Sequence, residues 1–188
     1  MHKTYNRIPM IGFAAWSGTG KTTLLRALLP RLRERRLRVG VVKHAHHDFD
    51  IDIPGKDSYE LRRAGATHVL VGSRRRWALV VETDLQEDPS LAEMLAHLGG
   101  EALDLILIEG LKREAIPKIE LHRPALGMPT LFPDDPNIVA IATDRPIATP
   151  PSVALLDLND PDQIVAFILR HLGLADNVGR ELADMGTP

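Results

Sequence analysis

The feature that most constrains this chain is the run Ala-Trp-Ser-Gly-Thr-Gly-Lys-Thr at residues 15–22. It follows an apolar stretch at residues 8–14 and precedes leucines at helical spacing, as in a phosphate-binding P-loop between a buried strand and a helix. Such a loop turns backbone N–H groups and the positive end of the next helix toward nucleotide phosphates. Ala15 stands where the pattern usually has its first glycine, and alanine fits there if its φ is negative. The sequence therefore predicts a nucleoside triphosphate with Mg²⁺ as the ligand.

The residues of this loop have distinct expected roles. Gly18 and Gly20 let the backbone approach the α and β phosphates. Lys21 reaches the β and γ oxygens, and we assign it a catalytic role because it neutralises charge on the transferred phosphoryl group. The Thr22 hydroxyl is the expected Mg²⁺ ligand. The remaining predicted nucleotide contacts are Trp16, Ser17, Thr19 and Thr23.

Composition limits the other function classes. With 188 residues, the chain has the length of one domain,. Its 23 basic and 25 acidic residues nearly balance, so no overall basic field favours nucleic acid. It has no cysteine, which excludes disulfides and thiolate metal sites. The N-terminal residues resemble neither a signal peptide nor a membrane span, so we expect a cytoplasmic protein without membrane partners.

Apolar strand-like runs alternate with helical patterns, which predicts an α/β fold of the P-loop NTPase type: a mainly parallel sheet flanked by helices. We expect one nucleotide-binding domain over residues 1–174 and a flexible tail at 175–188. The predicted buried strands are residues 8–14, 39–43, 103–109, 138–142 and 153–156. Residues 118–122 alternate between polar and apolar side chains, as in an exposed or edge strand.

Two segments depart from this alternation. The strand-like runs 67–71 and 77–81 are joined by a link too short for a crossover helix, which predicts an antiparallel hairpin extension. Residues 123–136 contain prolines at 124, 129, 133 and 136, which predicts an irregular loop.

Glu109 ends the apolar run 103–109 and is a second candidate for the phosphate site. An acid at the carboxyl end of a buried strand near a P-loop can hold Mg²⁺ or its water. Glutamate is one methylene longer than the commoner aspartate, so we expect a water-mediated contact. The alternative is a solvated acid that merely ends the strand.

The segment His44–Asp52 is rich in histidine and aspartate. It follows a predicted strand and therefore lies at the ligand-bearing carboxyl edge of the sheet. We interpret it as a nucleotide-responsive loop in which Asp48 or Asp50 orients the attacking water. A transition-metal site and a solvated loop are the alternatives.

Three further groups are candidates for ligand contacts. Thr143 and Asp144 close a late strand, where P-loop GTPases place the acid that reads the base. A carboxylate can accept from both N1–H and the 2-amino group of guanine. A cap or turn aspartate is the alternative. Lys112 and the triplet Arg74–Arg76 could each hold a phosphorylated partner ligand, or lie in solvent.

Together these motifs resemble the molybdopterin-guanine dinucleotide biosynthesis protein B family. The resemblance rests on residues 13–25 and on residues 43–65, which contain Pro-Gly-Lys-Asp-Ser at 54–58. Further matches at 76–79, 104–110, 118–119 and 153–160 extend it over residues 8–170. The departure at Ala15 belongs to the pattern of this family.

The resemblance implies a GTP-binding protein with weak GTPase activity, an adapter beside the guanylyltransferase that joins GMP to molybdopterin. GTP and Mg²⁺ are the implied cofactors, and the transferase and molybdopterin itself are the implied partners. It also implies a homodimer with shared strands, which would suit the hairpin at 67–81 and the strand at 118–122. The residues that it assigns to phosphate and Mg²⁺ are Gly18, Gly20, Lys21, Thr22 and Thr23, supported by Glu109.

Two other functions remain open from the residues. One is a small-molecule kinase, with arginines 62–63 and 74–76 closing over the acceptor. The other is a non-catalytic module that carries molybdopterin and uses the nucleotide only as a structural ligand.

Overall fold

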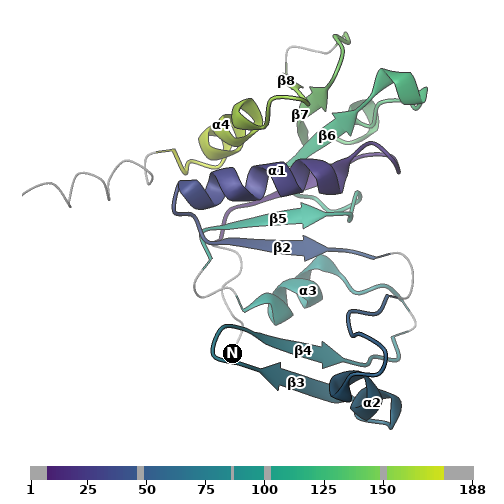
Figure 1. Cartoon of the computed structure of the whole chain (residues 1–188). Coiled ribbons are helices and arrows are strands. Elements are labelled where there is room, and N and C mark those ends of the chain that lie inside the picture. The colour runs from purple at the N-terminus through teal and green to yellow at the C-terminus, as the bar shows by residue number, and fades with distance from the viewer. Residues whose placement is uncertain (1–7, 46–48, 86, 100–102, 149–151, 176–188) are drawn as a thin grey trace, which may run out of the picture. The chain divides into compact units, whose positions relative to one another are not determined.

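The computed structural model describes residues 8–45, 49–85, 87–99, 103–148 and 152–175 (Figure 1). The chain divides into two compact units. Residues 45–90 form the smaller unit, and residues 1–44 with 91–188 form the larger one. The tail predicted at 175–188 lies, from residue 176 onward, outside the described residues.

A six-stranded sheet forms the centre of the larger unit, in the order β2-β5-β1-β6-β7-β8. All of its strand pairs are parallel, so the carboxyl ends of the strands meet at one edge. The predicted α/β fold with a mainly parallel sheet is confirmed. The strand bounds are β1 (Met10–Ala14), β2 (Val39–Lys43), β5 (Leu105–Glu109), β6 (Lys118–His122), β7 (Ile138–Thr143) and β8 (Ala154–Asp157).

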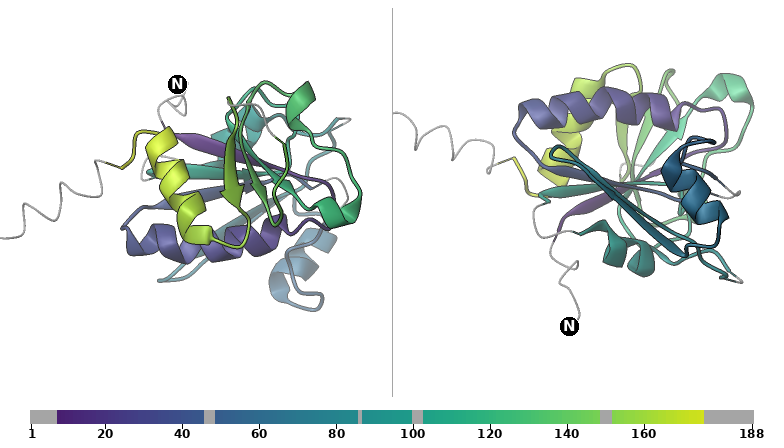
Figure 2. Two further views of the ribbon diagram at one scale, coloured as in Figure 1. Left: turned by 90° about the horizontal axis from the view of Figure 1, so that it is seen from above. Right: turned by 60° about the horizontal axis from the view of Figure 1, so that its bottom comes forward.

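Helices cover both faces of this sheet (Figure 2). α1 (Lys21–Glu34) and α4 (Pro161–His171) pack against one face, in a core that includes Leu105 and Leu107. α3 (Leu91–Leu98) packs against the other face, where Ile106 and Ile108 lie. Neighbouring residues of β5 thus point to opposite, equally apolar layers, as in a parallel strand buried on both sides. The strand that leads into the P-loop, β1, lies next to β5 in the sheet and pairs with β6 on its other side.

The position of β6 corrects a sequence prediction. Residues 118–122 were expected in an exposed or edge strand, but β6 lies between β1 and β7 and is buried along its length. Its charged side chains find partners there: Lys118 pairs with Asp135 at 3.0 Å, and Glu120 accepts from the backbone N–H of Leu131 at 2.7 Å. Both edges of β6 are paired, so the expected sharing of this strand in a dimer is wrong.

The loop that supplies these partners contains two single turns of 3₁₀ helix, Pro124–Leu126 and Phe132–Asp134. The polar face of β6 is therefore covered by its own following loop. Alternation in the sequence reflected two different buried environments: Ile119 and Leu121 face the core of α1 and α4.

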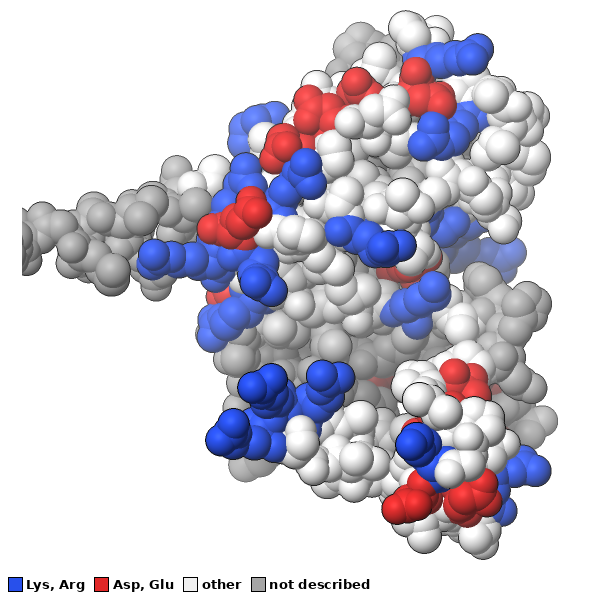
Figure 3. Space-filling model, viewed as in Figure 1, with Lys and Arg blue, Asp and Glu red and all other residues white. Residues whose placement is uncertain are grey.

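The smaller unit contains α2 (Asp57–Arg63) and an antiparallel ribbon of β3 (His68–Gly72) and β4 (Trp77–Val81). The predicted hairpin is confirmed. On one face of the ribbon Leu70 lies opposite Leu79, and both are exposed. Figure 3 shows a group of basic side chains at the turn of this hairpin, where Arg74–Arg76 are exposed.

In the described part of the chain, no helix combines the length and apolar character needed to cross a bilayer.

Candidate phosphate site

The loop between β1 and α1 has the backbone that its glycines predict. Gly18 has φ 78° and Gly20 has φ 103°, both in the left-handed region. Nothing lies within 4 Å of a Cβ built at either glycine, so the backbone conformation, and not crowding, requires glycine here. Gly20 is also the N-cap of α1. The loop therefore leads directly into a helix N-terminus, where free N–H groups favour anions.

Lys21 lies across this loop. Its Nζ donates to the carbonyl oxygens of Ala15 at 3.1 Å and Trp16 at 3.3 Å. Burial lowers the pKa of Lys21, and the positive charges of Lys112 and Lys43 lower it further, while Glu109 opposes them. Three ammonium groups thus act on one another beside a single carboxylate. This cluster has a net positive charge that a polyanion would neutralise.

Thr22 and Glu109 meet beside this cluster. The Thr22 hydroxyl donates to Oε1 of Glu109 at 2.9 Å, and Lys43 Nζ lies 3.8 Å from Oε2 of the same carboxylate. A hydroxyl and a carboxylate are the hard oxygen ligands that Mg²⁺ prefers. Two cis ligands of an octahedral Mg²⁺ lie about 3 Å apart, so this pair fits the ion. Glu109 lies at the carboxyl end of β5, and Thr22 lies in the first turn of α1 beside it.

The glycine after Glu109 has a structural reason. Gly110 has φ 102°, and a Cβ at this position would lie 3.0 Å from His44 Cβ. The His44 N–H also donates to the Glu109 carbonyl at 2.9 Å. The ends of β2 and β5 are therefore tied closely together, which fixes the direction of the Glu109 side chain.

Trp16 connects the loop to two other segments. Its indole N–H donates to the carbonyl of Pro129 at 2.8 Å. The Lys112 ammonium lies 4.7 Å from the centre of its ring, within the range of a cation–π contact. The sequence indicated Trp16 and Lys112 as separate candidates, and the structure brings them together.

Arg123 is a residue of this site that the sequence analysis missed. It follows β6, and its Nε donates to the Thr19 carbonyl at 3.0 Å. One terminal nitrogen donates to Oδ2 of Asp144 at 2.6 Å. Arg123 therefore joins the P-loop to the end of β7. Its position at a strand end on the carboxyl edge of the sheet was the signal that could have identified it.

Thr143 and Asp144 lie at the end of β7, beside a cavity of about 300 Å³. The Thr143 hydroxyl donates to the Arg145 carbonyl at 2.9 Å. The cavity is at the small end of the range for ligand pockets. It is lined by residues 143–146, 155–157 and 159.

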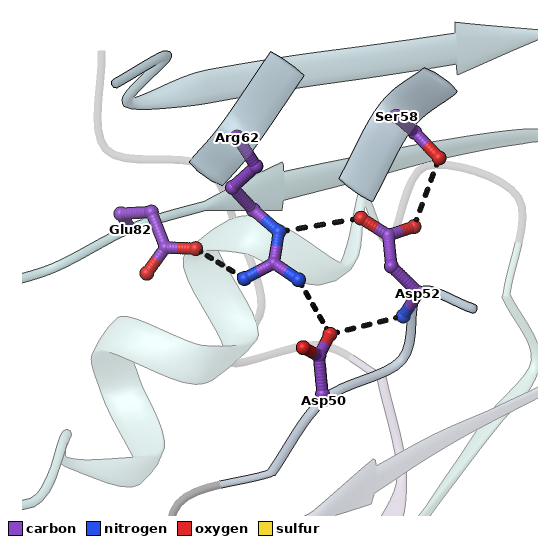
Figure 4. A network of polar contacts seen from close by, with 5 residues as sticks. All are labelled: Asp50, Asp52, Ser58, Arg62 and Glu82. Carbon is purple, nitrogen blue, oxygen red and sulfur yellow. Dashed lines mark hydrogen bonds and ion pairs between the residues drawn. The ribbon is translucent and has the colours of Figure 1, made fainter. Parts of the chain in front are cut away.

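The smaller unit holds a cluster around Arg62, drawn in Figure 4. Its guanidinium donates to Asp50 at 2.5 Å, Glu82 at 2.6 Å and Asp52 at 3.2 Å. Asp50 was a candidate for orienting water, and the structure places it in this ion-pair network. The hydrogen bond from Arg62 holds the pKa of Asp50 below its ordinary value. Asp48, the other candidate, lies outside the described residues.

A comparison with protein-family models identifies the family of this chain. The model of the family described as molybdopterin guanine dinucleotide synthesis protein B, MobB, matches residues 10–144. This chain belongs to the MobB family. The match begins with the first residue of β1 and ends with Asp144, so it spans the P-loop, Glu109 and Arg123.

Two bacterial proteins are similar over most of their length. The molybdopterin-guanine dinucleotide biosynthesis adapter protein of Escherichia coli is 48% identical over 166 residues, which are 88% of this chain and 94% of that protein. The protein of the same name from Haemophilus influenzae is 41% identical, over 87% of this chain and 89% of that protein. The resemblance noted from the sequence is therefore confirmed.

Solved MobB structures have the same fold. The crystal structure of Bacillus subtilis MobB superposes with a TM-score of 0.68 at 23% identity, covering 88% of this chain and 98% of that one. Another crystal structure, of molybdopterin-guanine biosynthesis protein B, gives a TM-score of 0.67 at 24% identity, over 87% and 99%. The parallel sheet with its flanking helices and added antiparallel pair is thus a MobB architecture.

Proposed function

We propose that this chain is a GTP-binding adapter in the biosynthesis of molybdopterin-guanine dinucleotide. It assists the guanylyltransferase and hydrolyses GTP slowly. The names of the bacterial relatives support the adapter role. The observation that carries the nucleotide part is the meeting of Lys21, Lys43 and Lys112 with Thr22 and Glu109 at one P-loop.

The triphosphate binds where Lys21 now contacts its own loop. A β/γ oxygen replaces the carbonyls of Ala15 and Trp16 as the acceptor for Nζ. Backbone N–H groups of residues 16–20 and of Thr22 and Thr23 surround the α and β phosphates. Lys43 and Lys112 add positive charge, which compensates for the desolvation of the phosphates.

Mg²⁺ is held by the Thr22 hydroxyl, with Glu109 as a direct ligand or through water. When bound, the ion supplies Lewis-acid neutralisation of the β and γ phosphates. The Lys43 ammonium beside Glu109 keeps that carboxylate oriented toward Thr22.

The guanine base lies at the end of β7, with Thr143 and Asp144 as its contacts. A carboxylate accepts from N1–H and the 2-amino group of guanine, whereas adenine presents an acceptor at N1. The cavity beside Asp144 supports this placement by its size and its position at the same sheet edge as the P-loop.

Hydrolysis is slow because its machinery is incomplete. Lys21 neutralises charge, and Asp48 or Asp50 orients the attacking water. The hydrogen bond from Arg62 lowers the pKa of Asp50, so this carboxylate is a weak base toward the attacking water. Isolated Ras-type GTPases turn over at about 10⁻⁴ s⁻¹, and we expect a basal rate of that order, raised by a partner that contributes positive charge.

The partners are the guanylyltransferase, molybdopterin and a second copy of this chain, all in the cytoplasm. The exposed apolar face of the hairpin supports the homodimer: Leu70, Leu79 and Trp77 are 67%, 47% and 70% exposed. Apolar side chains of this size on one ribbon face are typical of a surface that becomes covered.

Calorimetric titration with GTP and ATP, each with and without Mg²⁺, tests the nucleotide part. We expect Mg²⁺-dependent binding with GTP preferred, and loss of binding in Lys21→Ala. Preference for ATP would remove the base-reading role of Asp144. Transfer of a labelled γ-phosphate to a pterin instead of water would favour the kinase alternative.

The adapter part needs a separate assay. Guanylylation of molybdopterin by the transferase is measured with the wild-type chain and with Lys21→Ala. We expect stimulation only by the wild type. Equal stimulation by both would favour the non-catalytic carrier.

A further inference from the structure

Arg123 lies between the two ends of the proposed nucleotide site. Its side chain is 35% exposed, and it donates hydrogen bonds to two different segments. One is the carbonyl of Thr19 in the P-loop, and the other is the carboxylate of Asp144 after β7. A charged hydrogen bond in a partly buried place is among the stronger polar contacts in proteins. The guanidinium therefore holds two loops that are far apart in the sequence.

Only one of the two carboxylate oxygens of Asp144 has a hydrogen-bond partner in the part of the chain that the structure describes. Oδ2 receives the Arg123 hydrogen bond, while Oδ1 is buried without a hydrogen-bond partner among the described residues. Leaving a buried acceptor without a donor costs free energy, so a donor at this oxygen would be stabilising. Arg123 thus orients the Asp144 carboxylate through Oδ2. Oδ1 remains available to accept a hydrogen bond from a ligand.

The peptide that Arg123 holds lies in the middle of the P-loop. Thr19 is 2% exposed, and its hydroxyl donates to the Trp16 carbonyl at 2.8 Å. Gly18 and Gly20 flank it in left-handed conformations. Because glycines on both sides make this peptide easy to rotate, a fixed acceptor contact at its carbonyl orders the backbone that meets the phosphates.

We propose that Arg123 is a positioning residue that couples the P-loop to Asp144, so that each end of the nucleotide site orders the other. This inference rests on the proposed GTP binding. Its distinctive consequence is that Asp144 influences the binding of a ligand that has no base. Such coupling between sites is reciprocal in free energy.

Binding of magnesium tripolyphosphate, measured by calorimetry, tests the coupling. We expect Asp144→Asn and Arg123→Gln each to weaken tripolyphosphate binding by about fivefold or more. The double variant should bind no more weakly than the weaker single variant, because both changes remove one connection. Arg123→Lys should recover part of the loss. Arg33→Gln, an exposed arginine of α1, removes the same charge and should bind like wild type.

Two results would overturn the coupling: unchanged tripolyphosphate affinity in Asp144→Asn, or losses that add fully in the double variant. Thermal unfolding of each variant reports whether it is folded. If Arg123→Gln does not fold, the same double-mutant cycle is measured with Arg123→Lys and Asp144→Glu. If the wild type binds neither GTP nor tripolyphosphate, the proposed function is wrong and the coupling with it. If the wild type binds both and only the cycle fails, the function stands without the coupling.

A second readout uses inosine triphosphate, which lacks the 2-amino group. Reciprocity predicts that Arg123→Gln lowers the preference for GTP over this analogue by about fivefold or more. An unchanged preference would contradict the ordering of Asp144 by Arg123. Equal binding of both nucleotides by the wild type would instead contradict base reading by Asp144, and the tripolyphosphate cycle would still decide the coupling.

Discussion

The hydroxyl of Thr22 donates a 2.9 Å hydrogen bond to Oε1 of Glu109, a residue 87 positions later in the chain. This contact joins the first turn of α1 to the carboxyl end of β5. Because β1 and β5 are paired in parallel, with Phe13 opposite Glu109, the sheet itself brings the two oxygens together. The pairing of β1 with β5 therefore positions both residues of the proposed Mg²⁺ site.

Replacing Glu109 by glutamine should separate metal-dependent from metal-independent binding. We expect Glu109→Gln to weaken GTP binding in the presence of Mg²⁺ by about 10- to 100-fold. Binding without Mg²⁺ should stay equal or become tighter, because a negative charge near the phosphates is removed. Titrations with and without the ion measure both. Glu34→Gln, an exposed acid at the end of α1, is the control, and equal losses with and without Mg²⁺ would contradict the prediction.

The lysine cluster predicts how GTP affinity depends on pH. Burial and the charges of Lys112 and Lys43 lower the pKa of Lys21, and bound phosphates would raise it again. Binding therefore takes up a proton where free Lys21 is partly deprotonated, and affinity falls as pH rises through the lowered pKa.

The variant Lys112→Gln checks this origin. Without the Lys112 charge the pKa of Lys21 is higher, so the alkaline loss of affinity should begin at higher pH. Arg33→Gln should leave the pH at which affinity begins to fall unchanged. An unmoved profile in Lys112→Gln would mean that another group controls the alkaline loss.

Glu120 predicts a pH dependence of stability. Burial raises the pKa of this carboxyl, and the N–H groups of Leu131 and Phe132 only partly oppose the shift. Above the ordinary value of 4.5, the unfolded chain loses this proton first. The folded protein is therefore most favoured below that value, and this contribution is lost as pH rises through the raised pKa.

Urea unfolding of wild type and Glu120→Gln across this pH range measures the effect. The slope due to Glu120 should vanish in the variant. At neutral pH the variant also replaces a two-oxygen acceptor, and an N–H left without a partner costs about 1–3 kcal/mol. An unchanged slope would contradict the assignment to Glu120, and Glu34→Gln controls for loss of an exposed acid.

The Arg62 cluster predicts local instability when its guanidinium is shortened. Arg62→Lys keeps the charge but loses the planar arrangement of donors that reaches three carboxylates. We expect faster hydrogen exchange in residues 49–63 and unchanged exchange in β5 of the larger unit. The neighbouring exposed Arg63, changed to lysine, is the control. Equal protection in both variants would show that the network does not order this segment.

The stabilisation that the Arg62 cluster provides is also lost at low pH. The hydrogen bond from Arg62 lowers the pKa of Asp50, so its stabilising effect is complete above the ordinary pKa and is lost as pH falls through the lowered one. Exchange measured over this interval in wild type and Arg62→Lys should converge at the acid end.

The parts of the fold that could be predicted from the sequence are those set by local patterns. Gly18 and Gly20 predict the turn of the P-loop, the apolar run 105–108 of β5 predicts a buried parallel strand, and the short link after Gly72 predicts the hairpin. Asp160 likewise caps α4 through a local pattern: it stands directly before Pro161 and accepts from the N–H groups of Asp162 and Gln163,.

The missed features depend on partners far away in the sequence. β6 resembled an edge strand because its alternate residues are polar, and their burial is explained only by partners in the loop that follows. Arg123 likewise has no motif of its own: its two acceptors come from other elements, 104 and 21 positions away. Hydrogen bonds between distant segments leave no period in the sequence.

Trp16 gives this protein an internal optical probe. Its indole is in the P-loop, under the Lys112 ammonium and bonded to Pro129, so any ligand that rearranges the loop changes the polarity around a fluorophore. The chain has two tryptophans, and the other, Trp77, is on the exposed hairpin. A Trp77→Phe protein would therefore report the state of the loop by its own emission, without any attached dye.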